Sequence, residues 1–156
     1  MDKKPLKICF AASTGGHFEQ LMMLQPLMEQ YNSFILTEKT DYKISDSSYP
    51  VFYLFQVNRR EFLFLPKMLA NAIKSVFLYL KQKPDVIICT GVLAMIPMCL
   101  FMKLMRKKLI FIESFAKVSS PTLSGKLLYK YADRFYVQWE EMLSFYPDAI
   151  YKGGIY

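Results

Sequence analysis

The chain has 156 residues, of which 53% are hydrophobic and 16% aromatic, and its formal net charge is +7. This composition excludes an intrinsically disordered chain, and the length is sufficient to bury a core. We therefore expect one folded domain over residues 1–156.

The cysteines and the positive charge limit the kinds of site and partner. Cys9, Cys89 and Cys99 stand in apolar runs without the spacing of metal ligands, which predicts core thiols in a reducing compartment and no metal site. No secretory signal precedes the first apolar run, so we expect a cytoplasmic protein. Aliphatic and aromatic residues beside the basic clusters favour anionic lipid over nucleic acid as the partner. A generically basic surface is the alternative.

The first element is an apolar run over residues 6–11, which leads into Ala12-Ser13-Thr14-Gly15-Gly16-His17 and an amphipathic pattern. This order predicts a strand, a glycine turn and a helix whose first backbone N–H groups suit a phosphate. Adjacent glycines let a ligand approach the backbone closely. The spacing matches neither a dinucleotide fingerprint nor a P-loop, so a tight turn without a ligand is the alternative. The candidate phosphate ligands in this turn are Ser13, Thr14, Gly15 and Gly16.

Two further strands are predicted at residues 33–37 and 51–54, with a polar loop over residues 38–49 between them. A helical pattern then runs from Phe62 to Gln82, with Pro66 in its first turn. Basic and aromatic side chains at its start are typical of a helix that lies on a membrane surface. For the body of the helix, packing on a sheet with solvated lysines is the alternative. We expect membrane contact through Arg59, Arg60, Phe62, Phe64 and Lys67.

The apolar stretch over residues 86–105 is divided by Thr90-Gly91 and Pro97, which predicts a buried strand, a turn and a helix instead of a membrane span. A strand at residues 109–112 ends at Glu113-Ser114. The remaining elements are a helix over 124–131, a strand over 134–137, a short helix over 138–146 and a strand over 149–151. This alternation predicts an α/β fold with a Rossmann-like, mostly parallel sheet and helices on both faces.

In sheets of this kind, ligands bind at the carboxyl ends of the strands. Three separate motifs follow predicted strands: Ser13 to His17, Thr90-Gly91 and Glu113-Ser114. We therefore expect the three motifs to meet in one crevice, where Thr90, Gly91 and Ser114 join the candidate ligands of phosphate.

The same motifs carry a family resemblance. Thr14-Gly15-Gly16-His17, Thr90-Gly91 with Pro97, and Glu113-Ser114-Phe115-Ala116 resemble the N-terminal half of GT-B glycosyltransferases of the MurG type. A more specific block covers residues 120–126, 131–133 and 137–139. With it, nearly the whole chain is similar to the accessory subunits of split glycosyltransferases for bacterial capsule and exopolysaccharide. Those subunits are relatives of the eukaryotic membrane-anchor subunit of the second GlcNAc transferase in the dolichol pathway.

The resemblance implies that two polypeptides bind the two substrates of one reaction. A half-domain of this kind faces the membrane and holds a lipid-diphosphate-linked sugar acceptor, while a separate polypeptide binds the UDP-sugar donor. No tightly bound cofactor is then expected on this chain. The implied reaction is inverting hexosyl transfer to an acceptor hydroxyl, with little activity from this chain alone. Because this sequence shows no N-terminal transmembrane helix like that of the eukaryotic anchor subunits, we expect peripheral attachment at the inner face of the plasma membrane.

Sugar transfer needs a base for the acceptor hydroxyl. His17, the only histidine, is one candidate because the neutral imidazole is favoured at a helix N-terminus, and Glu113 is the other. The alternatives are that His17 only bonds backbone and that Glu113 orients a loop or caps a helix. Trp139 and Glu140, near the expected domain junction, are candidates for the partner interface, with ordinary packing and solvated charge as the alternative.

Two other functions stay open at this point. The chain can be a non-catalytic scaffold that only recruits its partner to the membrane, or a stand-alone nucleotide-binding protein. The missing acidic ribose ligand of a dinucleotide fingerprint argues against NAD. Nucleic-acid binding is the least favoured function.

Overall fold

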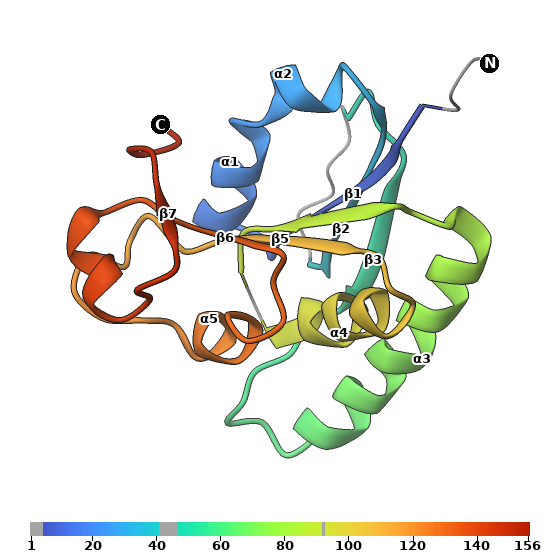
Figure 1. The fold of residues 1–156 in the computed structure, drawn as a ribbon. Coiled ribbons are helices and arrows are strands. Elements are labelled where there is room, and N and C mark those ends of the chain that lie inside the picture. The colour runs from blue at the N-terminus through green and yellow to red at the C-terminus, as the bar shows by residue number, and fades with distance from the viewer. Residues whose placement is uncertain (1–4, 41–46, 92) are drawn as a thin grey trace.

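The computed structural model describes residues 5–40, 47–91 and 93–156. At its centre is a seven-stranded sheet with the order β3-β2-β1-β4-β5-β6-β7, in which every neighbouring pair is parallel (Figure 1). The strands are β1 (Lys7–Ala11), β2 (Asn32–Lys39), β3 (Val51–Phe55), β4 (Val86–Cys89), β5 (Lys108–Ile112), β6 (Arg134–Val137) and β7 (Ile150–Tyr151). The predicted α/β, Rossmann-like fold is confirmed.

Helices cover both faces of this sheet (Figure 1). One face carries α1 (Gly16–Met22) and α2 (Gln25–Met28), and the other carries α3 (Phe64–Gln82), α4 (Ile96–Leu104) and α5 (Leu123–Leu128). Two short 3₁₀ helices, η1 (Leu93–Met95) and η2 (Glu140–Ser144), follow β4 and β6. Because all the strands are parallel, the loops that follow them lie at a single edge of the sheet.

Side chains alternate between two cores along the central strands. On β1, Cys9 and Ala11 pack in the core under α3 and α4, whereas Ile8 and Phe10 pack in the core under α1 and α2. This is the period of two that a strand covered on both sides requires. The three cysteines are buried free thiols, and Cys9 has a raised pKa because burial disfavours the thiolate. The sequence reading of core thiols is therefore confirmed.

Several predicted boundaries differ from those of the structure. The pattern after the glycine turn gives two short helices, because Pro26 cannot stand inside a continuous helix without losing a hydrogen bond and colliding with the preceding turn. Strand β2 extends to Lys39, so Glu38 belongs to a strand and not to the predicted loop. Residues 41–46 of that loop lie outside the described residues. The helix expected to reach Tyr131 ends at Leu128, and the segment predicted as a helix after β6 is η2.

The outer edge of β3 is covered by polar groups of its own crossover helix. The amide of Asn71 on α3 accepts a hydrogen bond from the Phe55 N–H at 2.8 Å and donates one to the Phe55 carbonyl at 2.9 Å. Lys74 donates to the Tyr53 carbonyl at 3.5 Å. Asn71 is therefore buried because it takes the place of a neighbouring strand.

Candidate functional site

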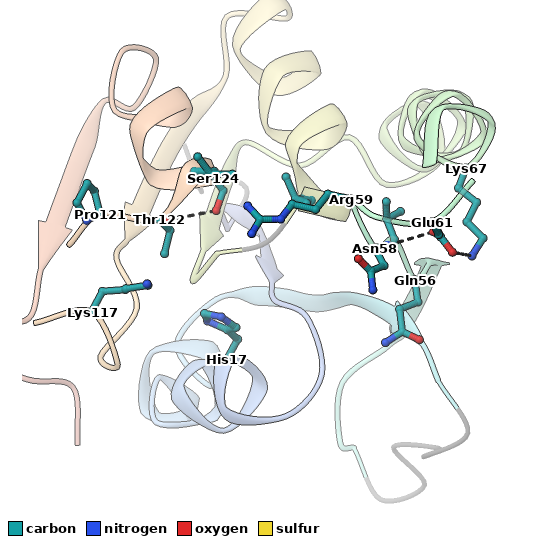
Figure 2. Close-up of a pocket in the computed structure, with 13 residues that line it drawn as sticks. His17, Gln56, Asn58, Arg59, Glu61, Lys67, Lys117, Pro121, Thr122 and Ser124 are labelled. Carbon is teal, nitrogen blue, oxygen red and sulfur yellow. Dashed lines mark hydrogen bonds and ion pairs between the residues drawn. The ribbon is translucent and has the colours of Figure 1, made fainter. Parts of the chain in front are cut away.

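A cavity of about 730 Å³ opens at the carboxyl edge of the sheet. Figure 2 shows side chains from several separate segments pointing into this space. The segments follow β1, β3, β4 and β5. The lining residues are His17, Gln56, Val57, Asn58, Arg59, Glu61, Lys67, Leu93, Lys117, Pro121, Thr122, Leu123 and Ser124.

The cavity spans the point where the strand order reverses. Strands β2 and β3 lie on one side of β1, and β4 to β7 lie on the other. His17 follows β1 and Leu93 follows β4, so the cavity spans the crevice where open α/β sheets bind ligands. The three motifs expected in one crevice follow β1, β4 and β5, which are consecutive in the sheet, so they lie at one edge, and of their residues His17 is in the cavity lining.

His17 stands in the first turn of α1, and its ring points into the cavity (Figure 2). Its Nδ1 is buried and has no hydrogen-bond partner among the described residues. Burial lowers the pKa of His17, although the backbone of Thr90 and the negative charge of Glu113 oppose the shift. The imidazole is therefore neutral at neutral pH, which a general base requires. That role stays a prediction.

The turn after β4 holds His17 in place. The Thr90 hydroxyl, which is fully buried, donates a hydrogen bond to the His17 backbone carbonyl at 3.0 Å. At Gly91, where φ is +118°, a Cβ would lie 3.3 Å from Cε1 of the His17 ring. A glycine is thus required both by the backbone conformation and by the ring that packs on it. Because the Thr90 hydroxyl proton is already used, the structure favours a positioning role over the predicted phosphate contact.

Two cations lie in the cavity without a carboxylate partner. Figure 2 shows the Arg59 guanidinium and the Lys117 ammonium pointing into the cavity from opposite sides, above the ring of His17. In the described part of the chain, neither side chain has a carboxylate oxygen within 4.0 Å. Lys67, by contrast, pairs with Glu61 at 2.7 Å. Unpaired cations in a concave site are suited to an anionic ligand, and a diphosphate is one such group.

A tight turn after β3 fixes the backbone from which the Arg59 side chain extends into the cavity. The Asn58 N–H donates to Oε1 of Glu61 at 3.0 Å, and Oδ1 of Asn58 accepts from the Arg60 N–H at 3.0 Å. Just before this turn, Oε1 of Glu38 accepts from the Val57 N–H at 3.3 Å. Burial raises the pKa of Glu38, and the Val57 N–H opposes that shift. These bonds give the segment a defined shape between β3 and α3.

Glu113 is a buried carboxylate behind the cavity wall. Its side chain is 1% exposed and does not line the cavity. It accepts hydrogen bonds from the Ser114 N–H at 2.9 Å, the Thr122 hydroxyl at 2.8 Å and the Tyr146 hydroxyl at 2.8 Å. This geometry favours the alternative in which Glu113 orients a loop over the one in which it removes a proton from the acceptor.

The other predicted phosphate ligands are at the same edge but outside the cavity lining. Gly15, with φ +74°, and Gly16 are exposed, and a Cβ at either would meet nothing within 4 Å. Ser13 and Ser114 are buried, and the Ser13 hydroxyl donates to the Thr14 carbonyl at 3.3 Å. The glycine turn is therefore open to a ligand beside His17. Contact of these residues with a phosphate stays a prediction.

The predicted membrane segment begins a larger apolar surface. Phe62 is 98% exposed, whereas Phe64 and Lys67 are half-buried and Arg59 points into the cavity. The exposed side chains continue along one side of α3, and we call them the α3 outer stripe: Leu65, Leu69, Ile73, Phe77 and Leu80. A helix in a soluble domain ordinarily presents polar side chains on its outer side. The stripe therefore extends the surface suited to a membrane beyond the residues expected from sequence.

Trp139 and Glu140 were expected at a partner interface. Trp139 is half-buried, donates from Nε1 to the Phe115 carbonyl at 2.6 Å and packs on the Phe115 ring with 4.9 Å between centroids. These contacts give Trp139 a packing role inside this chain. Glu140 is exposed. Its contact with a partner stays a prediction.

Sequence reasoning missed most of the cavity wall. Gln56, Asn58 and Lys117 stand in loops after strands, where no motif marks them, whereas Thr122 and Ser124 lie in the family-specific block over residues 120–126 but were given no role in the site. The signal that was available is topological, since each follows β3 or β5 at the edge already expected to bind the ligand. No helix in the described ranges combines the length and the apolar character that crossing a bilayer takes.

Comparisons with known sequences and structures fit this architecture. The family described as "Oligosaccharide biosynthesis protein Alg14 like" matches residues 55–155, which is more than half of the chain. The UDP-N-acetylglucosamine transferase subunits ALG14 of Homo sapiens and Mus musculus are 27% and 25% identical, and each alignment covers 98% of this chain and 84% of the relative. The corresponding subunit of Yarrowia lipolytica is 39% identical over 79 residues, 47% of this chain and 37% of that protein.

Among solved structures, MurG of Acinetobacter baumannii superposes with a TM-score of 0.73 at 16% identity, covering 88% of this chain and 43% of MurG. A UDP-N-acetylglucosamine 2-epimerase from Rickettsia bellii gives a TM-score of 0.74 at 11% identity, covering 97% of this chain and 45% of the epimerase. This chain thus spans less than half of each of these enzymes, and the likeness concerns the fold alone. From the family match and the full-length relatives together, the chain belongs to the Alg14-like family of oligosaccharide biosynthesis proteins.

Proposed function

We propose that this chain is the acceptor-binding subunit of a two-component glycosyltransferase. It binds a lipid-diphosphate-linked sugar at the membrane and acts with a separate subunit that holds the UDP-sugar donor. The observation that carries the proposal is the cavity with Arg59 and Lys117, which opens next to the exposed apolar residues at the start of α3. A lipid diphosphate combines these two chemistries in one molecule.

The cavity provides for the charged part of such an acceptor. A diphosphate brings negative charge that Arg59 and Lys117 are positioned to neutralise from two sides. His17 lies at the base of the same space with its ring inside the cavity. A neutral imidazole there is suited to accept the proton of the acceptor hydroxyl when the sugar is transferred. The exposed N–H groups near Gly15 and Gly16 offer a second set of phosphate donors.

The exposed apolar surface is suited to the membrane in which the lipid part of the acceptor lies. Phe62 and the α3 outer stripe expose large hydrophobic side chains, and Lys74 and Lys81 are exposed on the same helix. Apolar side chains enter the acyl boundary while lysines meet anionic headgroups, which is how interfacial helices attach. In this proposal the protein attaches peripherally at the inner face of the plasma membrane, with the mouth of the cavity next to the bilayer.

The donor belongs to the partner in this proposal. The family relatives are named as subunits of a UDP-N-acetylglucosamine transferase, and this chain matches only one half of MurG. The description of these relatives as subunits supports a second polypeptide, on which we place the UDP-sugar, and we propose no tightly bound cofactor on this chain. Synthesis of bacterial capsule or exopolysaccharide repeat units is the proposed setting, supported by the resemblance of the sequence motifs, and the proposed reaction is inverting hexosyl transfer.

Reconstitution tests the proposal directly. The chain is combined with a partner of similar length, sought as a neighbouring open reading frame that encodes a nucleotide-sugar half-domain. UDP-N-acetylglucosamine is the donor and a short-chain isoprenyl diphosphate sugar is the acceptor. We expect little or no transfer by either subunit alone and strong transfer by the pair. Transfer by the partner alone at the rate of the pair would contradict the proposal.

A scaffold function is the competing reading, and the same assay separates the two. If the chain only recruits its partner, detergent-solubilised acceptor removes the need for a membrane and His17→Ala leaves the rate of the pair unchanged. If the chain binds the acceptor, the variant and the charge-neutral variants of Arg59 and Lys117 reduce transfer even in detergent. The cavity with its two unpaired cations favours acceptor binding.

A further inference from the structure

The loop from Ser114 to Thr122 contributes part of the cavity wall, and one carboxylate holds both of its ends. The Ser114 N–H at the start of the loop donates to Oε1 of Glu113 at 2.9 Å. At the other end, the Thr122 N–H donates to Oε2 at 3.2 Å, and the Thr122 hydroxyl donates to Oε1 at 2.8 Å. The chain therefore leaves Glu113 and returns to it, with Lys117 between the two attachment points.

The carboxylate has no capacity left for a substrate. Besides the loop, the Tyr146 hydroxyl donates to Oε2 at 2.8 Å. Four donors thus fill the hydrogen-bonding capacity of an ionised carboxylate, which has about four lone-pair sites. Burial and the negative charge of Glu113 raise the pKa of Tyr146, so its hydroxyl keeps its proton and remains a donor. The Glu113 carboxylate is therefore anchored and inaccessible.

The backbone of Glu113 is fixed as firmly as its side chain. Gln138, after β6, donates from Nε2 to the Glu113 carbonyl at 2.8 Å. Gln20, on α1, accepts from the Phe115 N–H at 3.2 Å. The end of β5 is thereby tied to β6 and to α1, the helix that carries His17. The start of the loop is therefore attached to two neighbouring elements.

The start of α5 is built around the same carboxylate. Thr122 is the N-cap of α5, and its hydroxyl oxygen accepts from the Gly125 N–H at 2.8 Å. A Cβ at Gly125 would collide with Oε2 of Glu113 and lie 2.6 Å from the Tyr146 hydroxyl oxygen. The absence of a side chain at this position is what lets the carboxylate reach both the cap and Tyr146.

We infer that Glu113 is a positioning residue, whose carboxylate clamps the Ser114–Thr122 loop so that Lys117 and the start of α5 face the acceptor in the cavity. This inference deepens the proposed function and rests on it. The clamp acts through the loop and touches no reacting atom. Its loss weakens acceptor binding and leaves the chemistry of proton removal intact.

The experiment combines two variants with one control. Glu113→Gln keeps the shape of the side chain but replaces one acceptor oxygen by an NH₂ donor that faces other donors. Tyr146→Phe removes one hydrogen bond to the same carboxylate, and Tyr146 does not line the cavity. Glu29→Gln, at the exposed C-cap of α2, is the matched control for a lost carboxylate.

Three measurements are made on the reconstituted pair: amide hydrogen exchange of residues 114–122, the acceptor KM and kcat, and the pH profile of kcat. In Glu113→Gln we expect exchange in the loop and the acceptor KM each to rise about tenfold, the order expected for losing hydrogen bonds to a charged group. We expect kcat to change little and the pH profile to keep its shape. Tyr146→Phe shows the same pattern more weakly, and Glu29→Gln shows none of it.

Different results would overturn the inference and the proposed function. A thousandfold loss of kcat in Glu113→Gln with unchanged KM and unchanged loop exchange would make Glu113 a base and overturn the inference. Faster loop exchange with an unchanged acceptor KM would show that Glu113 only stabilises the loop and does not affect acceptor binding. This result would also overturn the inference. If Glu113→Gln does not fold, Tyr146→Phe alone decides on the same criteria. If the wild-type pair does not use the lipid diphosphate, the proposed function fails, while loop exchange still reports whether the clamp exists.

Discussion

The Thr90 hydroxyl donates to the His17 backbone carbonyl at 3.0 Å, which joins the turn after β4 to the first turn of α1. The two segments are 73 residues apart in sequence, and together with Gly91 they enclose one side of the imidazole. The position of the predicted base is therefore set by a strand other than its own.

Thr90→Val removes the hydrogen bond and keeps the volume of the side chain. Because Thr90 is fully buried, we expect the free energy of unfolding to fall by about 1–2 kcal/mol and transfer by the pair to weaken as His17 loses its support. Urea denaturation and steady-state kinetics measure the two effects. Thr90→Ser retains the hydroxyl and serves as the control. Equal behaviour of the two variants would show that the bond contributes nothing.

The protonation of His17 makes both stability and activity depend on pH. Burial lowers its pKa from 6.5 in the folded chain, so the unfolded chain binds this proton first as the pH falls. The contribution of the neutral histidine to stability is therefore present above about pH 6.5 and is lost as the pH drops through the folded pKa. If His17 is the base, kcat/KM, which reports the free enzyme, shows an acidic limb whose midpoint lies below 6.5, and His17→Gln abolishes it. A limb that persists in His17→Gln would assign the base elsewhere.

Arg59→Gln and Lys117→Gln each remove one unpaired cation from the cavity. We expect each to raise the acceptor KM roughly 10-fold, as for one lost charge-assisted contact, and to reduce the dependence of KM on ionic strength. The double variant should have a larger effect than either single variant. Lys83→Gln, between α3 and β4 at the opposite edge of the sheet, removes the same charge away from the cavity. If all three single variants change the acceptor KM alike, the effect comes from the net charge of the protein and not from the cations in the cavity.

Polar substitutions on the α3 outer stripe should detach the protein from membranes. Leu69→Gln and Phe77→Gln change exposed side chains, so we expect stability within about 0.5 kcal/mol of the parent. Binding to vesicles of anionic phospholipid, measured by co-sedimentation, should fall several-fold in each, because each variant removes buried apolar area at the interface. Leu6→Gln changes an exposed leucine before β1 and is the control. Unchanged sedimentation of the α3 variants would remove the stripe from the membrane contact.

Gly125→Ala tests the packing around the buried carboxylate. A methyl group there collides with Oε2 of Glu113 and crowds the Thr122 hydroxyl at 2.8 Å. Since overpacking in a close-packed interior costs about 1–3 kcal/mol, we expect a clear loss of thermal stability. Helix propensity alone predicts that Ala stabilises α5 relative to Gly. A loss of thermal stability would therefore report the collision with the carboxylate. A gain in stability would mean that the carboxylate has room to move.

The fold was predictable because its signal is repeated along the chain. Each strand is an apolar run that ends in polar or glycine residues, and most crossovers carry a helical pattern, the polar loop over residues 38–49 being the exception. The parallel order and the ligand edge followed from this alternation. Boundaries were less predictable. Pro26 divides the first helical pattern, and Glu38 extends β2 because its burial and its bond from the Val57 N–H depend on a distant loop.

Only part of the cavity could be predicted from the sequence. His17 and Gly91 stand in motifs, and their packing against each other agrees with the predicted convergence. The roles of Lys117, Thr122 and Tyr146 depend on how a loop folds back on Glu113, and no periodicity or spacing encodes that path. The sequence left Glu113 as a candidate base or as a residue that orients a loop, and only coordinates could separate a solvent-facing carboxylate from one enclosed by four donors.

The amide of Asn71 has a consequence for how copies of this protein meet. An open strand at the side of a sheet invites strands from other molecules, which leads to unwanted fibrous association. With Asn71 and Lys74 already bonded to the main chain of Phe55 and Tyr53, that side is closed by the molecule's own helix. A high local concentration therefore does not pair the sheets of neighbouring molecules edge to edge, and we expect Asn71→Leu to make concentrated samples aggregate.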